Sequence, residues 1–98
     1  MTTKDSIINL LKIHKNEFSG IGVSSVGLFG SYSRDEQSTN SDIDLLIDFE
    51  PGKSTFDNLM AFYDIVEGLF KNEKIEVVTK NSLSPYIGPK ILNEVVYA

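Results

Sequence analysis

Two aspartates separated by one residue form a pair of carboxylates that could bind a metal ion. Asp42 and Asp44 lie at the start of the run DIDLLIDF, which is rich in strand-favouring apolar residues. On a strand, side chains two residues apart leave the same face, about 6–7 Å apart along the backbone. Two such carboxylates repel each other unless a cation lies between them, and an oxygen-only pair favours a hard ion such as Mg²⁺. The pair therefore indicates a metal site, although two solvated aspartates at a strand edge would give the same pattern.

A glycine and a serine, Gly30 and Ser31, follow the preceding apolar run GVSSVGLF. A glycine lets the backbone approach a phosphate closely, and the free N–H groups at a helix start attract anions. Ser31 adds a hydroxyl donor, and Arg34 lies one helical turn further, where it could bind phosphate bidentately. The alternatives are an ordinary turn with a capping serine, and a surface ion pair between Arg34 and Asp35, Glu36 or another acid.

The combination of these two motifs is more informative than either motif alone. The phosphate-binding turn ends one expected strand, and the acid pair begins the next. An anion site beside a metal site is what binding of a nucleotide–Mg²⁺ complex requires.

The surrounding pattern predicts helices and strands in alternation, with no internal repeat and no linker. The order points to a small β-sheet covered by helices, an α/β (α+β) fold. The expected elements are a helix over 3–18, a strand over 22–29, one or two helical turns over 31–36 capped by Ser31, a strand over 42–49, a helix from Ser54 or Thr55 to Phe70, a strand over 74–79 and a short helix after Pro85.

Composition narrows the class of protein. The chain has 98 residues, of which 41% are hydrophobic and 23% charged, and these values are typical of one small globular domain. The absence of cysteine excludes disulfides, zinc thiolate sites and cysteine nucleophiles, and is consistent with a cytoplasmic location. We expect no signal peptide and no membrane span. A net charge of −5 argues against direct nucleic-acid binding, but a bound metal could still allow a nucleotide ligand.

The stretch GLFGSYSRDEQSTNSDIDLLIDF resembles the signature of the DNA polymerase beta superfamily of nucleotidyltransferases. More narrowly, it resembles the minimal nucleotidyltransferases that pair with HEPN proteins as MntA-type antitoxins. The resemblance implies a single nucleotidyltransferase domain over 1–98, with a small mixed β-sheet flanked by helices. It implies metal-binding and catalytic roles for Asp42 and Asp44. It implies nucleotide-binding roles for Gly30, Ser31, Arg34 and Ser41.

The family has a third carboxylate on the neighbouring strand, and its place here falls to Glu76. Flanked by Ile75 and Val77, Glu76 points to the opposite face from them, where it could lie beside the two aspartates and serve as a catalytic and metal ligand. A solvent-facing glutamate on an edge strand is the alternative. The family more often has aspartate here. Because glutamate is one methylene longer, we expect the difference to affect the catalytic rate more than metal binding.

Two further departures lie in the loop after Ser31. Ser33 replaces the usual alanine, and Asp35 stands where glycine is common. An aspartate at this position adds negative charge near the expected polyphosphate site and restricts the backbone. Neither change removes an expected ligand, but both could weaken ATP binding.

The resemblance implies Mg²⁺-dependent transfer of AMP from ATP to a tyrosine hydroxyl of a HEPN toxin, with two Mg²⁺ ions bound. In this reading the partner protein completes the site of a chain with no evident second domain. Two alternatives remain open. The acceptor could be a small molecule such as an aminoglycoside, or the chain could neutralise its toxin by binding alone.

Overall fold

The computed structural model describes residues 2–98 and contains a four-stranded mixed sheet in the order β3-β2-β1-β4. The central strand β1 pairs antiparallel with β2 and with β4, and β2 pairs parallel with β3. The strands are β1 (Val23–Phe29), β2 (Ile43–Phe49), β3 (Ile75–Thr79) and β4 (Val96–Tyr97). The sheet is therefore small and mixed, as expected.

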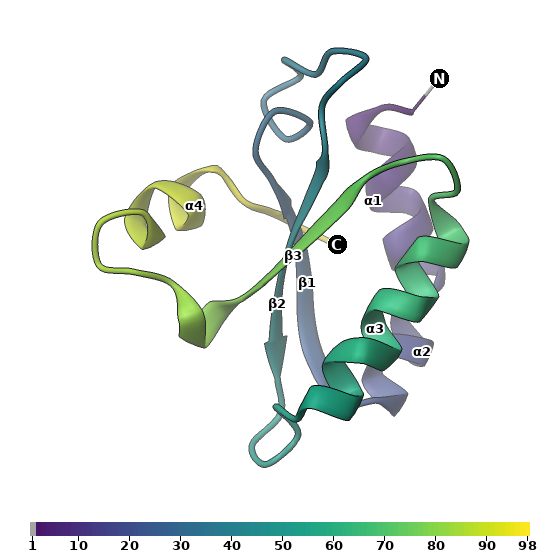
Figure 1. Cartoon of the computed structure of the whole chain (residues 1–98), viewed down its shortest axis with the longest axis vertical. Coiled ribbons are helices and arrows are strands. Elements are labelled where there is room, and N and C mark those ends of the chain that lie inside the picture. The colour runs from purple at the N-terminus through teal and green to yellow at the C-terminus, as the bar shows by residue number, and fades with distance from the viewer. Residues whose placement is uncertain (1) are drawn as a thin grey trace.

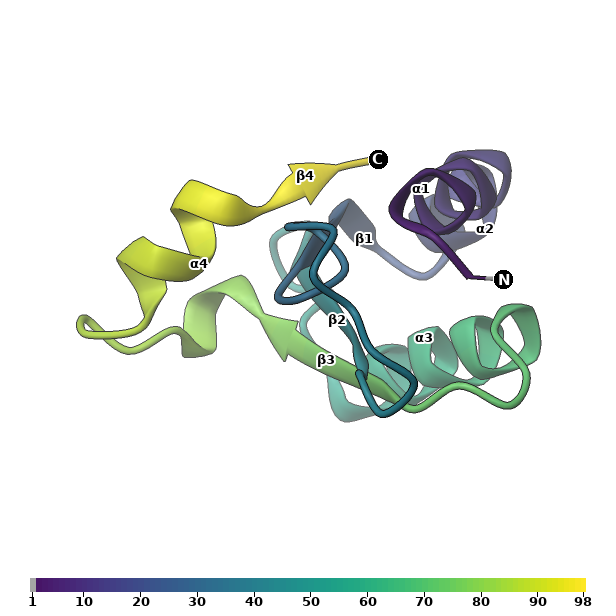
Figure 2. The same ribbon diagram turned by 90° about the horizontal axis from the view of Figure 1, so that it is seen from above.

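The helices lie on both sides of this sheet. Three of them, α1, α2 and α3, cover one face, and α4 lies on the other side, next to the C-terminus (Figures 1 and 2). The helices are α1 (Lys4–Ile13), α2 (Lys15–Gly20), α3 (Phe56–Leu69), the short 3₁₀ helix η1 (Lys80–Ser82) and α4 (Gly88–Glu94). Thr55 caps α3, and its hydroxyl accepts a hydrogen bond from the Asn58 N–H at 3.1 Å.

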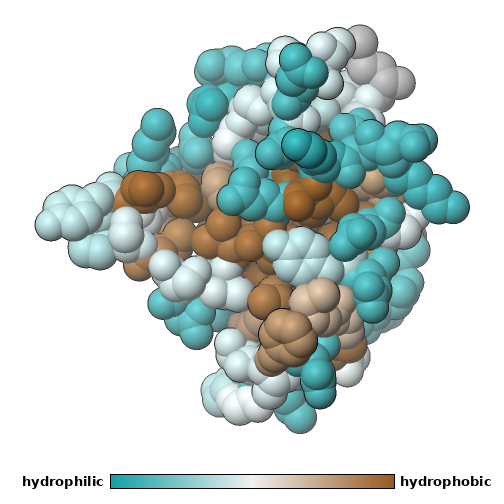
Figure 3. All heavy atoms as spheres, in the orientation of Figure 1, coloured by the Kyte–Doolittle hydropathy of each residue, from teal (hydrophilic) through white to brown (hydrophobic). Residues whose placement is uncertain are grey.

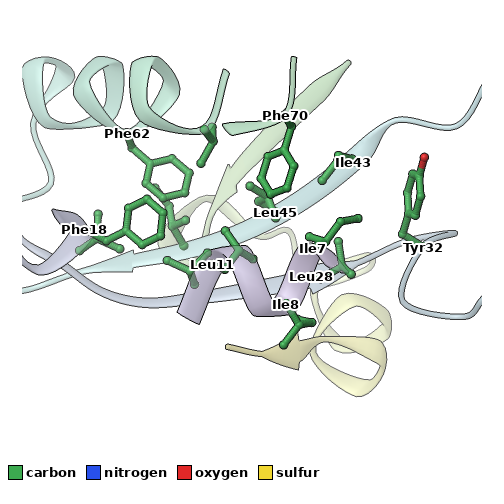
Figure 4. Packing of buried hydrophobic residues seen from close by; sticks show 14 residues of the cluster. Ile7, Ile8, Leu11, Phe18, Leu28, Tyr32, Ile43, Leu45, Phe62 and Phe70 are labelled. Carbon is green, nitrogen blue, oxygen red and sulfur yellow. The ribbon is translucent and has the colours of Figure 1, made fainter. Parts of the chain in front are cut away.

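The main core lies between the sheet and the helices α1–α3. Phe18 and Phe62 are fully buried there, with ring centroids 5.0 Å apart (Figure 4). Strand β2 alternates its side chains between the two faces of the sheet, which is the period expected of a strand. Ile43 and Leu45 face the main core, whereas Leu46 belongs to a second, smaller cluster with Phe29 and Ile91 of α4. Apolar side chains on both faces thus hold β2 rigidly, and β2 carries one of the two aspartates.

The predicted elements are present with five differences, one of which is the additional 3₁₀ helix η1. The helix expected over 3–18 is divided at His14, although both halves bury the same apolar face. Residues 31–35 form consecutive turns instead of a regular helix, so Ser31 caps no helix. Asp42 precedes β2, which begins at Ile43, and is not part of the strand. Strand β4 was not expected, because two residues are too few for periodicity to indicate a strand.

No helix within residues 2–98 combines the length and the apolar character that crossing a bilayer requires.

Candidate functional site

The turn after β1 brings the glycine of the predicted phosphate site against one of the aspartates. Gly30 has φ +78°, a left-handed conformation that side chains other than glycine rarely adopt. A Cβ atom at this position would overlap Oδ2 of Asp44 on the neighbouring strand. Glycine is therefore required here by the backbone and also by the packing of the carboxylate.

Backbone hydrogen bonds close the turn that follows Gly30. The Arg34 N–H donates to the Gly30 carbonyl at 3.3 Å, and the Glu36 N–H donates to the Ser31 carbonyl at 2.9 Å. The buried Ser33 hydroxyl also donates to the Gly30 carbonyl at 2.8 Å, so serine has a specific role where the family usually has alanine. Asp35 has φ +56°, which gives a physical reason for glycine being common at its position.

The three predicted acids gather at the start of β2 and β3. Asp44 lies directly opposite Glu76 in the parallel register of the two strands, and Asp42 immediately precedes β2. The pKa of Asp44 is raised to about 6, first by burial and then by the negative charges of Glu76, Asp42 and Glu94. The arrangement places like charges around a half-buried carboxylate, as a cation-binding site does.

The chemistry of these side chains fits Mg²⁺. The donors are all carboxylate oxygens, and a divalent cation would offset the repulsion that raises the pKa of Asp44. Within residues 2–98 no three acidic or histidine side chains already converge to ligand distance. Magnesium typically uses one or two carboxylates together with water and substrate phosphates, so a set completed by the nucleotide suits it.

The side chains that were expected to bind the nucleotide differ in their hydrogen-bond partners. Arg34 donates from Nε to Glu36 at 3.2 Å and from Nη1 to Glu94 at 2.6 Å, so an ion pair with another acid is present. Ser41 lies within its own loop, where its hydroxyl accepts from the Ser38 N–H at 2.9 Å. Ser31 is half-buried at the start of the turn, and its hydroxyl is not part of the hydrogen bonds that close the turn within residues 2–98.

Glu94, the last residue of α4, is the site residue that the sequence did not indicate. Its Oε1 accepts from the Gly30 N–H at 3.2 Å, and its Oε2 accepts from Arg34. It lies 64 residues from Gly30 in the chain and belongs to no motif. The pairing of β4 with β1 and the packing of α4 on the sheet bring it to the turn, so no local pattern could have found it.

An apolar groove of about 360 Å³ opens beside the acids. Asp44 and Glu76 line it on the sheet, and the remaining lining residues are Phe29, Val78, Ser82, Leu83, Ser84, Ile87 and Ile91. Apolar atoms extend from α4 across to the middle of the molecule in Figure 3. Ile87 is 59% exposed and the adjacent Tyr86 is 90% exposed, so this rim presents apolar surface to solvent.

The mixed sheet, the glycine-serine turn and the paired acids together define a nucleotidyltransferase. The family model described as a nucleotidyltransferase domain matches residues 7–98, and the chain belongs to this family.

Curated relatives match most or nearly all of the chain. The protein adenylyltransferase MntA of Thermococcus cleftensis is 38% identical, and the match covers 99% of this chain and 97% of the relative. A protein of Methanocaldococcus jannaschii, described as a candidate protein adenylyltransferase, is 44% identical over 76% of this chain and 78% of its own. These similarities agree with the expected relation to MntA-type minimal nucleotidyltransferases.

Solved structures show the same fold. One is described as a candidate minimal nucleotidyltransferase and matches with a TM-score of 0.81 at 25% identity, covering 97% of this chain and 95% of that one. Another is a toxin–antitoxin structure with AMP-PNP, with a TM-score of 0.64 at 21% identity over 98% of this chain and 72% of that one. Because its sequence identity is lower, the second match shows a shared fold and nothing more.

Proposed function

We propose that this nucleotidyltransferase transfers AMP from ATP to a tyrosine hydroxyl of a HEPN-type toxin and thereby acts as its antitoxin. The observation that carries the proposal is the position of Asp44, which is opposite Glu76 and in contact with the Gly30 turn. Acids that can hold Mg²⁺ and a turn that can hold a phosphate thus lie side by side. The relative named protein adenylyltransferase MntA supports transfer of AMP to a protein, and the toxin–antitoxin structure with AMP-PNP has the same fold.

The proposed roles follow from the position of each residue. Asp42, Asp44 and Glu76 would hold up to two Mg²⁺ ions, and the Ser31 hydroxyl and the Arg34 guanidinium would donate to the β- and γ-phosphates. When bound, Mg²⁺ neutralises phosphate charge and lowers the pKa of the attacking hydroxyl. The turn would fix the triphosphate so that the α-phosphorus faces the acceptor.

The reaction replaces one P–O bond with another. The phenolic oxygen bonds to the α-phosphorus, the bond from this phosphorus to the bridging α–β oxygen breaks, and pyrophosphate leaves. The phenolic proton is released in the same step. A tyrosine has an unperturbed pKa of about 10, so it needs activation to attack near neutral pH.

We propose that the apolar groove receives the aromatic ring of the acceptor. Asp44 and Glu76 lie on its wall, so a ring inserted there would carry its hydroxyl towards the acids. The exposed side chain of Ile87, which lines the groove, and that of Tyr86, the preceding residue in the chain, suit contact with a partner protein. The net charge of −5 disfavours direct binding to nucleic acid, and the cysteine-free composition suits the cytoplasm.

A labelling experiment tests the proposal. The chain is mixed with ATP labelled at the α-phosphate, Mg²⁺ and a HEPN protein encoded beside it. We expect label on the HEPN protein, loss of label with EDTA, and loss of label when the acceptor tyrosine is changed to phenylalanine. The double variant Asp42→Asn/Asp44→Asn should not label its partner, whereas the matched control Asp48→Asn, on the same strand, should.

The same experiment separates the two alternatives. Neutralisation of the toxin without label, persisting in the Asp42→Asn/Asp44→Asn variant, would show an antitoxin that acts by binding alone. Label appearing on an added aminoglycoside and not on the protein would show a small-molecule acceptor.

A further inference from the structure

Glu94 connects the C-terminal segment to the phosphate-binding turn through both oxygens of its carboxylate. Oε2 accepts from Arg34 Nη1 at 2.6 Å, and Oε1 accepts from the Gly30 N–H at 3.2 Å. The Glu94 side chain is only 17% exposed, whereas the other ion-pair partner of Arg34, Glu36, is 62% exposed. The contact with Glu94 is therefore the shorter and the better shielded of the two.

The backbone on each side of Glu94 fixes where its side chain points. Helix α4 ends at Glu94, and β4 begins two residues later and pairs with β1 through Gly27 and Leu28. Val95 packs so closely against Gly27 that a Cβ atom there would overlap it. Strand pairing and this close packing together hold Glu94 beside the turn.

Arg34 is held by carboxylates at two of its three nitrogens. Nε donates to Glu36 and Nη1 donates to Glu94, while Nη2 has no hydrogen-bond partner within residues 2–98. A free arginine side chain has many rotamers, and ordering it on binding lowers affinity. An arginine that is already ordered, with one nitrogen unengaged, avoids most of that loss.

We propose that Glu94 is a positioning residue that holds Arg34 and the Gly30 turn in the arrangement that receives the triphosphate. This inference rests on the proposed nucleotide-binding role of the turn. It assigns a function to the C-terminal segment, which carries neither the serine nor the acids of the expected site. An opposing effect exists, because a carboxylate near the triphosphate also repels it. The short contact and the shielding of Glu94 favour positioning, and the two effects predict opposite changes in affinity.

Calorimetric titration with the Mg²⁺ complex of the non-hydrolysable analogue α,β-methylene-ATP tests this. Glu94→Gln keeps the size of the side chain and one oxygen for the Gly30 N–H, but loses the charge that holds Arg34. We expect its Kd to rise about five- to tenfold. Glu36→Gln removes the same charge from the exposed partner of Arg34, and we expect its Kd to stay within about twofold of the unaltered chain.

A double variant separates positioning from a general loss of structure. In an Arg34→Ala background, Glu94→Gln should change the Kd by less than about twofold, because the group it positions is absent. An equal loss in both backgrounds would overturn the inference, and so would a Glu94→Gln variant that binds as tightly as the unaltered chain or more tightly. Glu94→Asp, which keeps the charge, should bind more tightly than Glu94→Gln. Failure of the unaltered chain to bind the analogue would overturn the proposed function itself.

Discussion

Gly30 and Asp44, on neighbouring strands, are packed so closely that the carboxylate occupies the space of a glycine side chain. Oδ2 of Asp44 lies so close to the position of a Cβ atom on Gly30 that the two atoms would overlap, and Gly30 has φ +78°. The two halves of the site, the turn and the acids, are thus in direct contact. Any side chain at position 30 disturbs both halves at once.

Gly30→Ala should destabilise the protein by about 1–2 kcal/mol from the left-handed backbone alone, with displacement of Asp44 in addition. In a domain of this size each kcal/mol lowers the Tm by about 4–8 °C, which thermal melting followed by circular dichroism can measure. The matched control is Gly68→Ala in α3, where a Cβ atom meets no neighbour and alanine favours the helix. We expect the control to be as stable as the original chain or more stable. A Gly30→Ala variant with an unchanged Tm would contradict the packing.

The raised pKa of Asp44 predicts a pH dependence of stability in the absence of metal. In the unfolded chain this carboxyl titrates near 3.8, and in the folded protein at about 6. Between these values the folded state binds the extra proton, so the contribution of this carboxyl to the free energy of unfolding is most favourable below about pH 4 and falls as the pH rises to 6. The variant Asp44→Asn removes this titration and should melt at a higher temperature than the unaltered chain at pH 8.

The measurement is a series of thermal melts from pH 3.5 to pH 8 in EDTA. The difference between Asp44→Asn and the unaltered chain should shrink steadily as the pH falls through the window from 6 to 4. Glu67→Gln, on the exposed side of α3, changes the net charge equally and is the matched control for the loss of one negative charge. If the melting temperatures of Asp44→Asn and the unaltered chain changed in parallel with pH, the pKa of Asp44 would not be raised in the folded protein.

Much of the site could be predicted because its information is local. The glycine-serine turn and the acid pair follow from residues close together in the chain, and the apolar run of β2 is typical of a strand that is covered on both faces. The position of Glu76 opposite Asp44 was predicted from the family pattern and from strand periodicity, and the parallel register agrees with it. Glu76 and Asp44 come together as soon as β3 pairs with β2.

Glu94 could not be predicted because its place depends on tertiary contacts alone. Strand β4 has two residues, and the pairing that holds it comes from β1, about 70 residues earlier in the chain. The position of Asp42 outside β2 was missed for a related reason. The strand begins where its first hydrogen bond forms, from the Ile43 N–H to the Lys74 carbonyl at 2.8 Å, and this partner is remote in sequence.

The left-handed backbone of Asp35 predicts different stabilities for two substitutions that remove the same charge. At φ +56°, Asp35→Ala adopts a conformation that costs a β-carbon residue about 1 kcal/mol or more, whereas Asp35→Gly adopts it freely. We therefore expect the glycine variant to melt about 4–8 °C above the alanine variant. Because both variants lose the carboxylate, a difference in their melting temperatures reports on the backbone alone. Equal melting temperatures would mean that residue 35 relaxes out of the left-handed region.

If the apolar groove receives the acceptor, a substitution in it should weaken acceptor binding and leave nucleotide binding unchanged. Ile87 lines the groove and is 59% exposed, so Ile87→Ser should leave the core intact. Because burying such a side chain against a partner contributes about 1 kcal/mol, the KM for the HEPN acceptor should rise about fivefold, while the Kd for ATP stays unchanged. The matched control is Ile13→Ser, because Ile13 is 72% exposed and is the last residue of α1, a helix that lies on the other side of the sheet (Figure 2). Steady-state labelling at varied acceptor concentration gives the KM, and calorimetry gives the Kd. If Ile87→Ser instead weakens ATP binding and leaves the acceptor KM unchanged, the groove holds the nucleotide base and the acceptor ring binds elsewhere.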